Sequence, residues 1–287
     1  MSRRVAAGAV LSALIVGACA PVDDTSRLPN GLPPLYAPSN GALAEVIRVP
    51  DGDSLVVLLN GVEERVRLIG INAPEQDECL GPESGEALRD LLDGTTVVLE
   101  ADEESTDQYG RLLRYVWIGD VLANRRQAAT GLAIARGFLP NTHLQHLLDE
   151  AEDLASNQKL GIWNPTACGG EAAPAVDIAL VEANPAGRDE DNLNDEYIVL
   201  VNPNDIAIDL TGWILRDSST SHRYEFPNGT TLEANAELTV RTGCGEDSAQ
   251  ELFWCAGGPV WDNGGDEAFL LSPSGAIAAT LEYKEQR

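Results

Sequence analysis

The chain has few basic residues, and lysine is almost absent. Of its 287 residues, 19 are Lys or Arg and 46 are Asp or Glu, which gives a net charge of −27, and Lys159 and Lys284 are its only lysines. The deficit extends along the chain, with a net charge of −12 over residues 42–170 and −16 over residues 171–287. A surface that attracts polyanions without specificity is therefore excluded. A phosphate ligand would have to be captured by a few placed arginines and a metal ion.

Long apolar runs are missing outside the N-terminus. Even there, the run from Val5 to Val16 is shorter than the about 20 residues that a membrane-spanning helix needs. Arg3 and Arg4 precede this run and small residues follow it, which is the order of a secretory signal peptide. We therefore expect residues 1–19 to be a targeting segment that is no part of the fold, and the protein to work outside the cytoplasm.

The signal segment ends in Val16-Gly17-Ala18-Cys19, which resembles the lipobox of bacterial lipoproteins. The resemblance implies that Cys19 is lipid-modified, becomes the mature N-terminus and anchors the protein to a bacterial membrane. The alternative is ordinary cleavage after Ala20, because Ala18-Cys19-Ala20 has the A-x-A form, and this would give a secreted soluble protein. Residues 20–41 contain five prolines and predict an extended tether.

Cysteine is scarce as well, with five in the chain. Apart from Cys19, four remain, an even number in a compartment that permits disulfides. Four cysteines allow three pairings, and the one that keeps each bond inside one domain joins Cys79 to Cys168 and Cys244 to Cys255. Free thiols are the alternative. The spacings do not match a zinc site, which needs close pairs of cysteines.

Two domains with different periodicities are expected. Residues 42–165 mix short apolar or alternating runs with amphipathic helices, which predicts an α+β domain on a small closed sheet. Its helices are expected over 83–92, 124–131 and 142–161, with Asn124 and Thr142 as N-caps. Residues 166–175 predict a linker. Residues 176–284 contain about seven strand-like runs, one of them 208–216, separated by turn signals as in a β-sandwich.

Three polar clusters of the first domain indicate its chemistry. Asp51-Gly52-Asp53-Ser54 puts carboxylates on a turn before a strand, and the stretch from Arg67 to Glu75 ends a strand with a carboxamide and a carboxylate. Asp107-Gln108-Tyr109-Gly110-Arg111 lies at the tip of a hairpin. Oxygen ligands hold Ca²⁺, two arginines neutralise a phosphate and its developing charge, and a carboxylate activates water. The set predicts metal-assisted phosphodiester hydrolysis.

The order and spacing of these motifs, from Ala44 to Trp163, resemble the staphylococcal-nuclease (thermonuclease) family. The resemblance implies an OB-type five-stranded barrel with three helices. The resembling stretches are Asp51-Gly52-Asp53-Ser54, Val66-Arg67-Leu68-Ile69-Gly70-Ile71-Asn72-Ala73-Pro74-Glu75, Asp107-Gln108-Tyr109-Gly110-Arg111, Gly131-Leu132-Ala133, Asn141-Thr142-His143 and Gly161-Ile162-Trp163.

The resemblance implies a Ca²⁺ site formed by the Asp53 carboxylate, the Asn72 side chain and the backbone carbonyl of Ala73. Asn72 departs from the family, which commonly has a second aspartate there. Its amide oxygen can coordinate Ca²⁺ without adding charge, and affinity depends on the charge of the ligands. Metal binding is therefore expected to be weaker than in the family. Gln108 likewise replaces a basic residue that is often found before the tyrosine.

The resemblance also implies the residues that act on the phosphate. Arg67 and Arg111 match the two arginines that bind phosphate and stabilise the transition state. Glu75 matches the glutamate that is usually assigned as general base or water-positioning residue. Tyr109 matches a tyrosine near the phosphate and sugar of the nucleotide.

The second domain shows no catalytic constellation, and its sequence resembles a lamin-tail domain, which implies an immunoglobulin-like sandwich. Trp213 is interpreted as a core residue of that sandwich rather than a ligand-binding aromatic. The resembling stretches are Val176-Asp177-Ile178-Ala179, Asn184-Pro185, Asn194-Asp195-Glu196-Tyr197-Ile198, Asp209-Leu210-Thr211-Gly212-Trp213, Phe226-Pro227-Asn228-Gly229-Thr230, Trp261-Asp262-Asn263 and Gly264 with Asp266-Glu267-Ala268.

Two further polar groups are interpreted as structural. His143 and His146 lack the carboxylate arrangement of a H-E-x-x-H metal site. The acidic run from Asp189 to Glu196 lacks the glycine of an EF-hand loop and is expected to be a solvated loop.

The sequence as a whole predicts an extracytoplasmic, lipid-anchored, Ca²⁺-dependent nuclease that hydrolyses DNA, and RNA as a further substrate, to 3′-phosphorylated products with little sequence preference. The lamin-tail domain is expected to position the enzyme through an unidentified ligand. The alternative is a noncatalytic surface adaptor that keeps the barrel and has lost efficient metal binding. Asn72 favours the adaptor, whereas Asp53, Arg67, Glu75 and Arg111 favour the enzyme.

Overall fold

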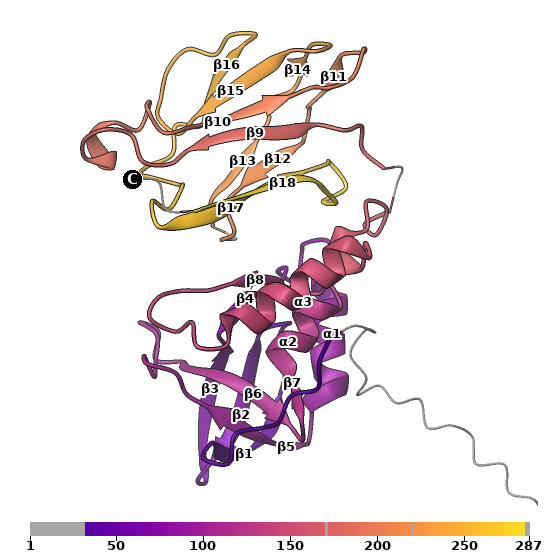
Figure 1. Ribbon diagram of the computed structural model, residues 1–287, viewed down its shortest axis with the longest axis vertical. Helices are drawn as coiled ribbons and strands as arrows, with labels where there is room; N and C mark the ends of the chain where they lie inside the picture. The colour runs from indigo at the N-terminus through magenta and orange to yellow at the C-terminus, as the bar shows by residue number, and fades with distance from the viewer. Residues whose placement is uncertain (1–31, 170–171, 220, 285–287) are drawn as a thin grey trace, which may run out of the picture.

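The structure, a computed structural model, describes residues 32–169, 172–219 and 221–284 and consists of two domains stacked end to end (Figure 1). The N-terminal domain is a small barrel with helices on one side, and the C-terminal domain is built of strands. The expected signal segment and Cys19 lie outside the described residues.

The first domain is a five-stranded barrel closed by pairing between β3 and β6. The strands run in the order β3-β2-β1-β5-β6, and the parallel register of Val66 with Leu112 and of Arg67 with Leu113 joins the last strand to the first. Short strands flank this barrel. The strands are β1 (Ala42–Arg48), β2 (Ser54–Leu59), β3 (Val62–Leu68), β4 (Gly70–Asn72), β5 (Thr96–Glu100), β6 (Leu112–Ile118), β7 (Val121–Leu122) and β8 (Ile134–Arg136).

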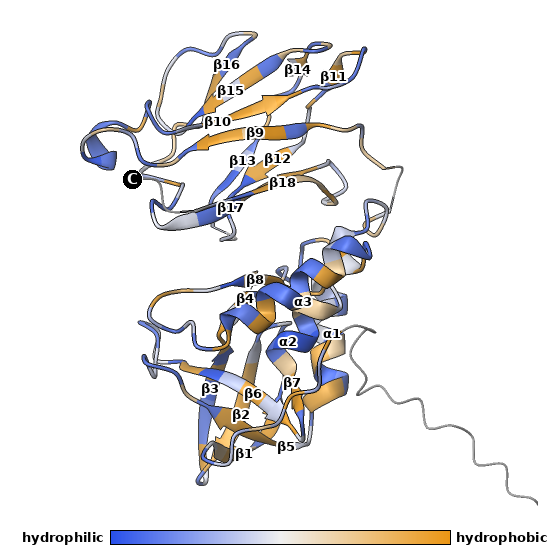
Figure 2. Ribbon diagram, in the orientation of Figure 1, coloured by the Kyte–Doolittle hydropathy of each residue, from blue (hydrophilic) through white to orange (hydrophobic). Residues whose placement is uncertain are grey.

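Three α-helices cover the barrel: α1 (Gly81–Leu92), α2 (Ala123–Ala129) and α3 (Gln145–Asn157). Figure 2 shows both apolar and polar residues on α1 and α3, as expected of amphipathic helices. The expected caps were wrong. Leu122 and Leu144 occupy the N-cap positions of α2 and α3, without side-chain capping bonds. Asn124 is instead buried inside α2, where Oδ1 accepts from the Val116 N–H (2.9 Å) and Nδ2 donates to the Ile69 carbonyl (2.8 Å).

Residues 32–41, the end of the expected tether, pack along the barrel. Leu32, Leu35 and Ala37 lie against the core of the first domain. The Pro33 carbonyl accepts a hydrogen bond from Arg125 Nη1 (2.7 Å), a fully buried side chain of α2. The hydrophobic effect accounts for this packing, because it removes three apolar side chains from water.

The second domain is a sandwich of two four-stranded sheets, ordered β16-β15-β10-β9 and β13-β12-β17-β18, with β11 and β14 as a separate pair. Trp213 is 3% exposed in its core, as predicted. Together with the closed barrel, this sandwich confirms the expected fold class. The strands are β9 (Asp177–Glu182), β10 (Tyr197–Val201), β11 (Ile208–Asp209), β12 (Ile214–Arg216), β13 (Arg223–Glu225), β14 (Thr231–Leu232), β15 (Glu237–Arg241), β16 (Glu251–Phe253), β17 (Gly265–Leu271) and β18 (Ile277–Lys284).

Two details of this domain differ from expectation. The single strand predicted over 208–216 is divided into β11 and β12, because Gly212 adopts a positive φ of 73° and turns the chain. Glu196, predicted as part of a solvated loop, is fully buried. Its carboxylate accepts hydrogen bonds from the Val260 N–H (3.1 Å) and the Trp261 N–H (3.0 Å), which offset the cost of burying the charge.

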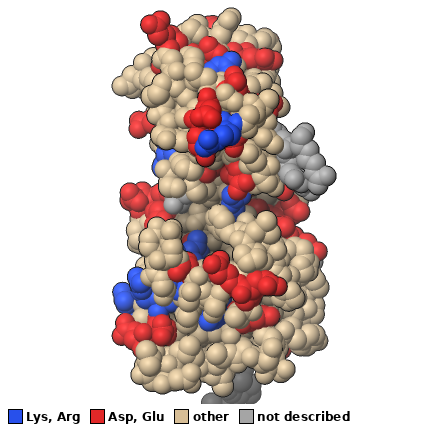
Figure 3. Space-filling model, turned by 90° about the vertical axis from the view of Figure 1, so that its left-hand side faces the viewer, with Lys and Arg blue, Asp and Glu red and all other residues tan. Residues whose placement is uncertain are grey.

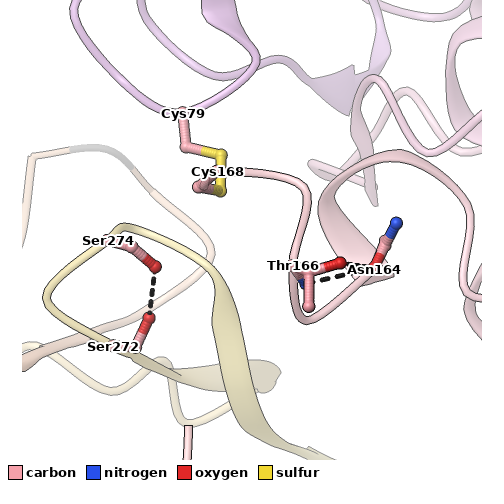
Figure 4. The surroundings of a disulfide bond; sticks show 6 residues. All are labelled: Cys79, Asn164, Thr166, Cys168, Ser272 and Ser274. Carbon is pink, nitrogen blue, oxygen red and sulfur yellow. Dashed lines mark hydrogen bonds between the residues drawn. A yellow bond between two sulfur atoms is a disulfide. The ribbon is translucent and has the colours of Figure 1, made fainter. Parts of the chain in front are cut away.

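Both expected disulfides are present, joining Cys79 to Cys168 and Cys244 to Cys255. The first has a sequence separation of 89 residues and constrains the unfolded chain by about 4–5 kcal/mol, against about 3 kcal/mol for the 11-residue separation of the second. Figure 4 shows the first bond facing the turn that carries Ser272 and Ser274 of the second domain. A side chain at Gly275 would meet Cys79 Cβ at 3.1 Å, so the two domains are in close contact here.

A small apolar cluster joins the domains. Ile134 and Ile162 of the first domain and Phe269 and Leu271 of the second are buried together, and the Trp163 and Phe269 rings lie 6.4 Å apart. Burying such side chains stabilises a contact by about 1.5–3 kcal/mol each. In Figure 1 the sheet that contains β17 and β18 faces β4, β8 and α3. No helix among the described residues is both long and apolar enough to cross a membrane.

Carboxylates from both domains face each other beside this cluster. Glu152 of α3, whose Oε1 accepts from the Ala135 N–H (2.9 Å), shares a cavity of about 820 Å³ with Asp266 and Glu267 of β17. Burial, followed by the charge of Glu267, raises the pKa of Glu152 to about 9. Burial also raises the pKa of Glu267 to about 7. Both side chains are therefore protonated in the folded protein at pH values where they ionise in the unfolded chain.

We predict that Glu152→Gln removes a loss of stability that grows as the pH rises from about 4.5 to about 9. An unfolded glutamate ionises near 4.5, so between about pH 4.5 and 9 the unfolded chain binds fewer protons and the wild type loses at most about 1.4 kcal/mol per pH unit through this group. Urea unfolding at pH 5, 7 and 9 measures the free energy of unfolding of the wild type and the variant. The variant should gain stability over the wild type as the pH rises, and the exposed control Glu150→Gln should not. Equal pH slopes for wild type and Glu152→Gln would contradict the prediction.

Candidate active site

Asp53 is the buried centre of the site. It lies in the turn before β2 and is 9% exposed. Its Oδ2 accepts from the Ala73 N–H (2.9 Å) and forms an ion pair with Arg67 Nη1 (3.0 Å). Asp51 Oδ1 accepts from the backbone N–H of Asp53 (3.1 Å) and shapes the turn. Burial raises the pKa of Asp53, an effect that Arg67 and the Ala73 N–H oppose.

Arg67 links Asp53 to Asn72. Its Nη2 donates to Asn72 Oδ1 (3.0 Å), while Nη1 also donates to the Leu68 carbonyl (2.8 Å). The strand order explains the grouping, because Ser54 at the start of β2 is the register partner of Arg67 near the end of β3. Asn72 follows at the end of β4. The structure therefore brings together Asp53, Arg67, Asn72 and Ala73, as the sequence motifs predicted.

Glu75 lies on the exposed loop that follows. Burial raises the pKa of its carboxyl group, and the charges of Asp53, Asp51 and Glu78 raise it further. Glu75 is therefore electrostatically coupled to the buried carboxylate. It also lines a cavity of about 450 Å³ together with Asn72 and Ala73.

The second domain reaches this loop at two points. Asn72 Nδ2 donates to the carbonyl of Ser218 (3.1 Å). Glu78 Oε2 accepts from the Glu75 N–H (3.0 Å), and Glu78 Oε1 forms an ion pair with Arg223 of β13. The amide of Asn72 thus has a fixed orientation, since Arg67 can only donate to it and Ser218 can only accept from it. An aspartate at this position could not make the Ser218 contact.

Arg111 and Tyr109 lie at the tip of the hairpin before β6. Asp107 Oδ2 forms an ion pair with Arg111 Nε (2.6 Å), and Asp107 Oδ1 accepts from the backbone N–H groups of both Tyr109 and Arg111. Tyr109 is 66% exposed, and the Arg111 guanidinium lies 5.8 Å from its ring centre. Arg111 stands two residues before the register partner of Arg67 on the neighbouring strand, and its side chain contacts Asp107 rather than Asp53.

The donor set fits a hard cation. Asp53 and Asn72 side chains and the Ala73 carbonyl offer only oxygen, the donor that Ca²⁺ prefers, and mutual repulsion among Asp51, Asp53 and Glu75 would be relieved by a positive ion. Within the described parts of the chain, no three His, Cys, Asp or Glu side chains are grouped as a metal site. The amide of Asn72, the backbone and water would therefore have to complete the coordination.

The contribution of the second domain could not be predicted from the sequence motifs. Glu78 stands three residues after Glu75 without a recognisable pattern, and Ser218 and Arg223 lie beyond the linker. The one available signal is an arginine, Arg216, at the end of an apolar strand in a strongly acidic domain.

Comparison with known proteins divides the chain at the same place as the structure. Residues 65–165 match the Staphylococcal nuclease homologue family, and residues 170–285 match the Lamin Tail Domain family. The matches follow each other without overlap, and the geometry described above lies mostly within the first.

Individual relatives match the first domain. The chain is 38% identical to the thermonuclease of Staphylococcus intermedius over 124 residues, 41% of this chain and 74% of that protein. It is 34% identical to the thermonuclease of Staphylococcus hyicus over 132 residues, 44% of this chain and 78% of that protein. It is also 34% identical to Endonuclease YncB of Bacillus subtilis (strain 168) over 127 residues, 41% of this chain and 59% of that protein. These similarities support a nuclease function. The chain belongs to the staphylococcal nuclease family and carries a lamin-tail domain after its nuclease domain.

Proposed function

We propose that the protein is an extracytoplasmic, Ca²⁺-dependent nuclease that hydrolyses DNA, and RNA as a further substrate, to 3′-phosphorylated products. The observation that carries the proposal is the joined set of Asp53, Arg67, Asn72 and Ala73 beside Glu75. This set combines a cation site, a phosphate-binding guanidinium and a carboxylate base. The relatives named as thermonucleases and as an endonuclease support the same activity.

The protein's own groups divide the work. Arg67 and Arg111 donate hydrogen bonds to phosphate oxygens and stabilise the charge that develops on them. Glu75 accepts a proton from the attacking water, whose oxygen bonds to phosphorus while the bond to the 5′-oxygen breaks and that oxygen takes up a proton. Asp53, Asn72 and the Ala73 carbonyl would hold Ca²⁺, which would supply Lewis-acid polarisation of the phosphate. The ion pair with Asp107 holds the Arg111 side chain at the tip of the hairpin before β6.

We predict Ca²⁺-dependent cleavage that requires Glu75. The full chain should release product from labelled single-stranded and duplex DNA with Ca²⁺ and none with chelator. Glu75→Gln should reduce kcat by about 10²–10⁴-fold, because it removes the proton acceptor. Glu103→Gln, an exposed glutamate outside the site, should cleave at the wild-type rate. Absence of Ca²⁺-dependent product at any salt concentration would favour a noncatalytic adaptor.

We predict that Asn72→Asp strengthens Ca²⁺ binding and weakens the contact between the domains. A second carboxylate should lower the Kd for Ca²⁺ by about one order of magnitude, since affinity follows the charge of the ligands. The same change replaces the N–H that Ser218 accepts, so the thermal midpoint should fall. Calorimetric titration and thermal unfolding measure the two effects. Gln108→Glu adds one charge on the exposed hairpin and is the matched control, and an unchanged Kd in Asn72→Asp would contradict a role for this residue in metal binding.

The location outside the cytoplasm and the lipid anchor at Cys19 are parts of the proposal that rest on the N-terminal sequence. We predict that cells producing the full chain incorporate labelled palmitate into it and retain it in the membrane fraction. Cys19→Ser should abolish both properties, because the thioether-linked lipid needs the cysteine sulfur. Release of wild-type protein into the medium without label would instead identify cleavage at Ala20.

A further inference from the structure

The cavity beside Glu75 has walls from both domains. The first domain contributes the stretch from Asn72 to Cys79, and the second contributes β12, β13 and the turn that follows β17. Its volume of about 450 Å³ is in the range of pockets that hold small ligands. Figure 3 shows basic side chains among acidic ones in the band between the two domains. The cavity shares Asn72, Ala73 and Glu75 with the candidate active site.

Arg216 is the unusual group in this cavity. It is only 8% exposed, and it makes none of the ion pairs found within the described residues. Nη1 donates to the Asp217 carbonyl (3.0 Å), and the guanidinium lies 4.6 Å from the ring centre of Phe269. Its Nε has no hydrogen-bond partner in the described part of the chain. A buried guanidinium without a direct ion pair is costly, and burial lowers its pKa, an effect that the charges of Glu78, Asp217 and Glu267 oppose.

The other charges of the cavity point to the missing anion. Arg223 is the second cation of the lining and is already paired with Glu78. Glu75 and Asp77 are the remaining charged groups and belong to the loop of the candidate site. Residues 171–287 include six Lys or Arg residues against 22 Asp or Glu, yet two of the six line this cavity. In a segment with a net charge of −16, two arginines in one cavity are a specific placement rather than an effect of composition.

We propose that Arg216 binds a phosphate of the polynucleotide next to the one that is hydrolysed, so that the lamin-tail domain forms part of the substrate site. The inference rests on the proposed nuclease function, because that function supplies a chain of phosphates past Glu75. Guanidinium binds phosphate through charge-assisted hydrogen bonds, and Arg216 lines the cavity without an ion-pair partner among the described residues. Arg223 provides positive charge beside it and fixes Glu78.

The test is equilibrium binding of fluorescent four-nucleotide single strands to the full chain in chelator, where hydrolysis is absent. One strand has all its phosphates, and in each of the others one phosphate is replaced by a neutral methylphosphonate. For the wild type, neutralising the phosphate bound by Arg216 should weaken binding about tenfold, the effect of one charge-assisted contact. Arg216→Gln should bind the unmodified strand about tenfold more weakly and lose sensitivity to that one position. Arg216→Lys should retain part of the sensitivity.

Arg241→Gln is the matched control. Arg241 also lies on a strand of the second domain and over an aromatic ring, with its guanidinium 5.2 Å from the ring centre of Tyr197, but it does not line the cavity. This variant should keep the wild-type pattern. Equal binding by wild type and Arg216→Gln, equal sensitivity to every neutral position, or no binding by the wild type would overturn the proposal. If Arg216→Gln does not fold, Arg216→Lys with an unaltered wild-type pattern at every position would overturn it.

The two proposals fail in different ways. Binding that depends on Arg216 without hydrolysis in Ca²⁺ would refute the nuclease function and retain the phosphate site. Hydrolysis in Ca²⁺ with binding that is independent of Arg216 would refute the phosphate site and retain the nuclease.

Discussion

The packing of Phe269 and Leu271 against Ile134 and Ile162 determines how the two domains are placed. This contact brings the β12–β13 side of the sandwich next to the loop after β4. Without it, Asn72 and Glu78 would face water, and neither Ser218 nor Arg223 would have a partner in the first domain. The apolar cluster supplies most of the stabilisation, because the attraction within a buried ion pair such as Arg136–Asp266 is largely offset by the cost of desolvating both charges. The polar contacts set the register of one domain on the other, with Arg136 and Asp266 2.7 Å apart.

That placement gives a physical reason for the departure of Asn72 from the family pattern. Asn72 makes two hydrogen bonds with its side chain. Its Oδ1 accepts from Arg67, and its Nδ2 donates to the Ser218 carbonyl. Only a carboxamide satisfies both. A second carboxylate would strengthen a cation site and leave a carbonyl oxygen of the second domain without its donor. The contact between the domains therefore accounts for a carboxamide at this position.

The elements and the central site were predictable because their signals are local. Alternating apolar residues and glycine stops located the strands, and the order of the motifs placed Asp53, Arg67, Asn72 and Ala73 together. Asn124 was misassigned because an asparagine before a helix resembles a cap, whereas here its side chain bonds from inside the domain to β6 and to the turn between β3 and β4. The cavity could not be predicted from the sequence, because no local pattern indicates which face of the sandwich packs against which face of the barrel. Arg216 and Arg223 line the cavity only because the two domains are in contact.

The disulfide between Cys79 and Cys168 has a consequence for the strength of this association. Cys168 is fixed to the loop beside the site, and Val176 is already buried in the sandwich core, so eight Cα–Cα steps separate two anchored points. Such a chain reaches at most about 29 Å when fully extended. The second domain therefore meets its docking face at an effective concentration in the millimolar range or above. An interface too weak to hold two separate proteins together is therefore enough to keep these two domains in contact.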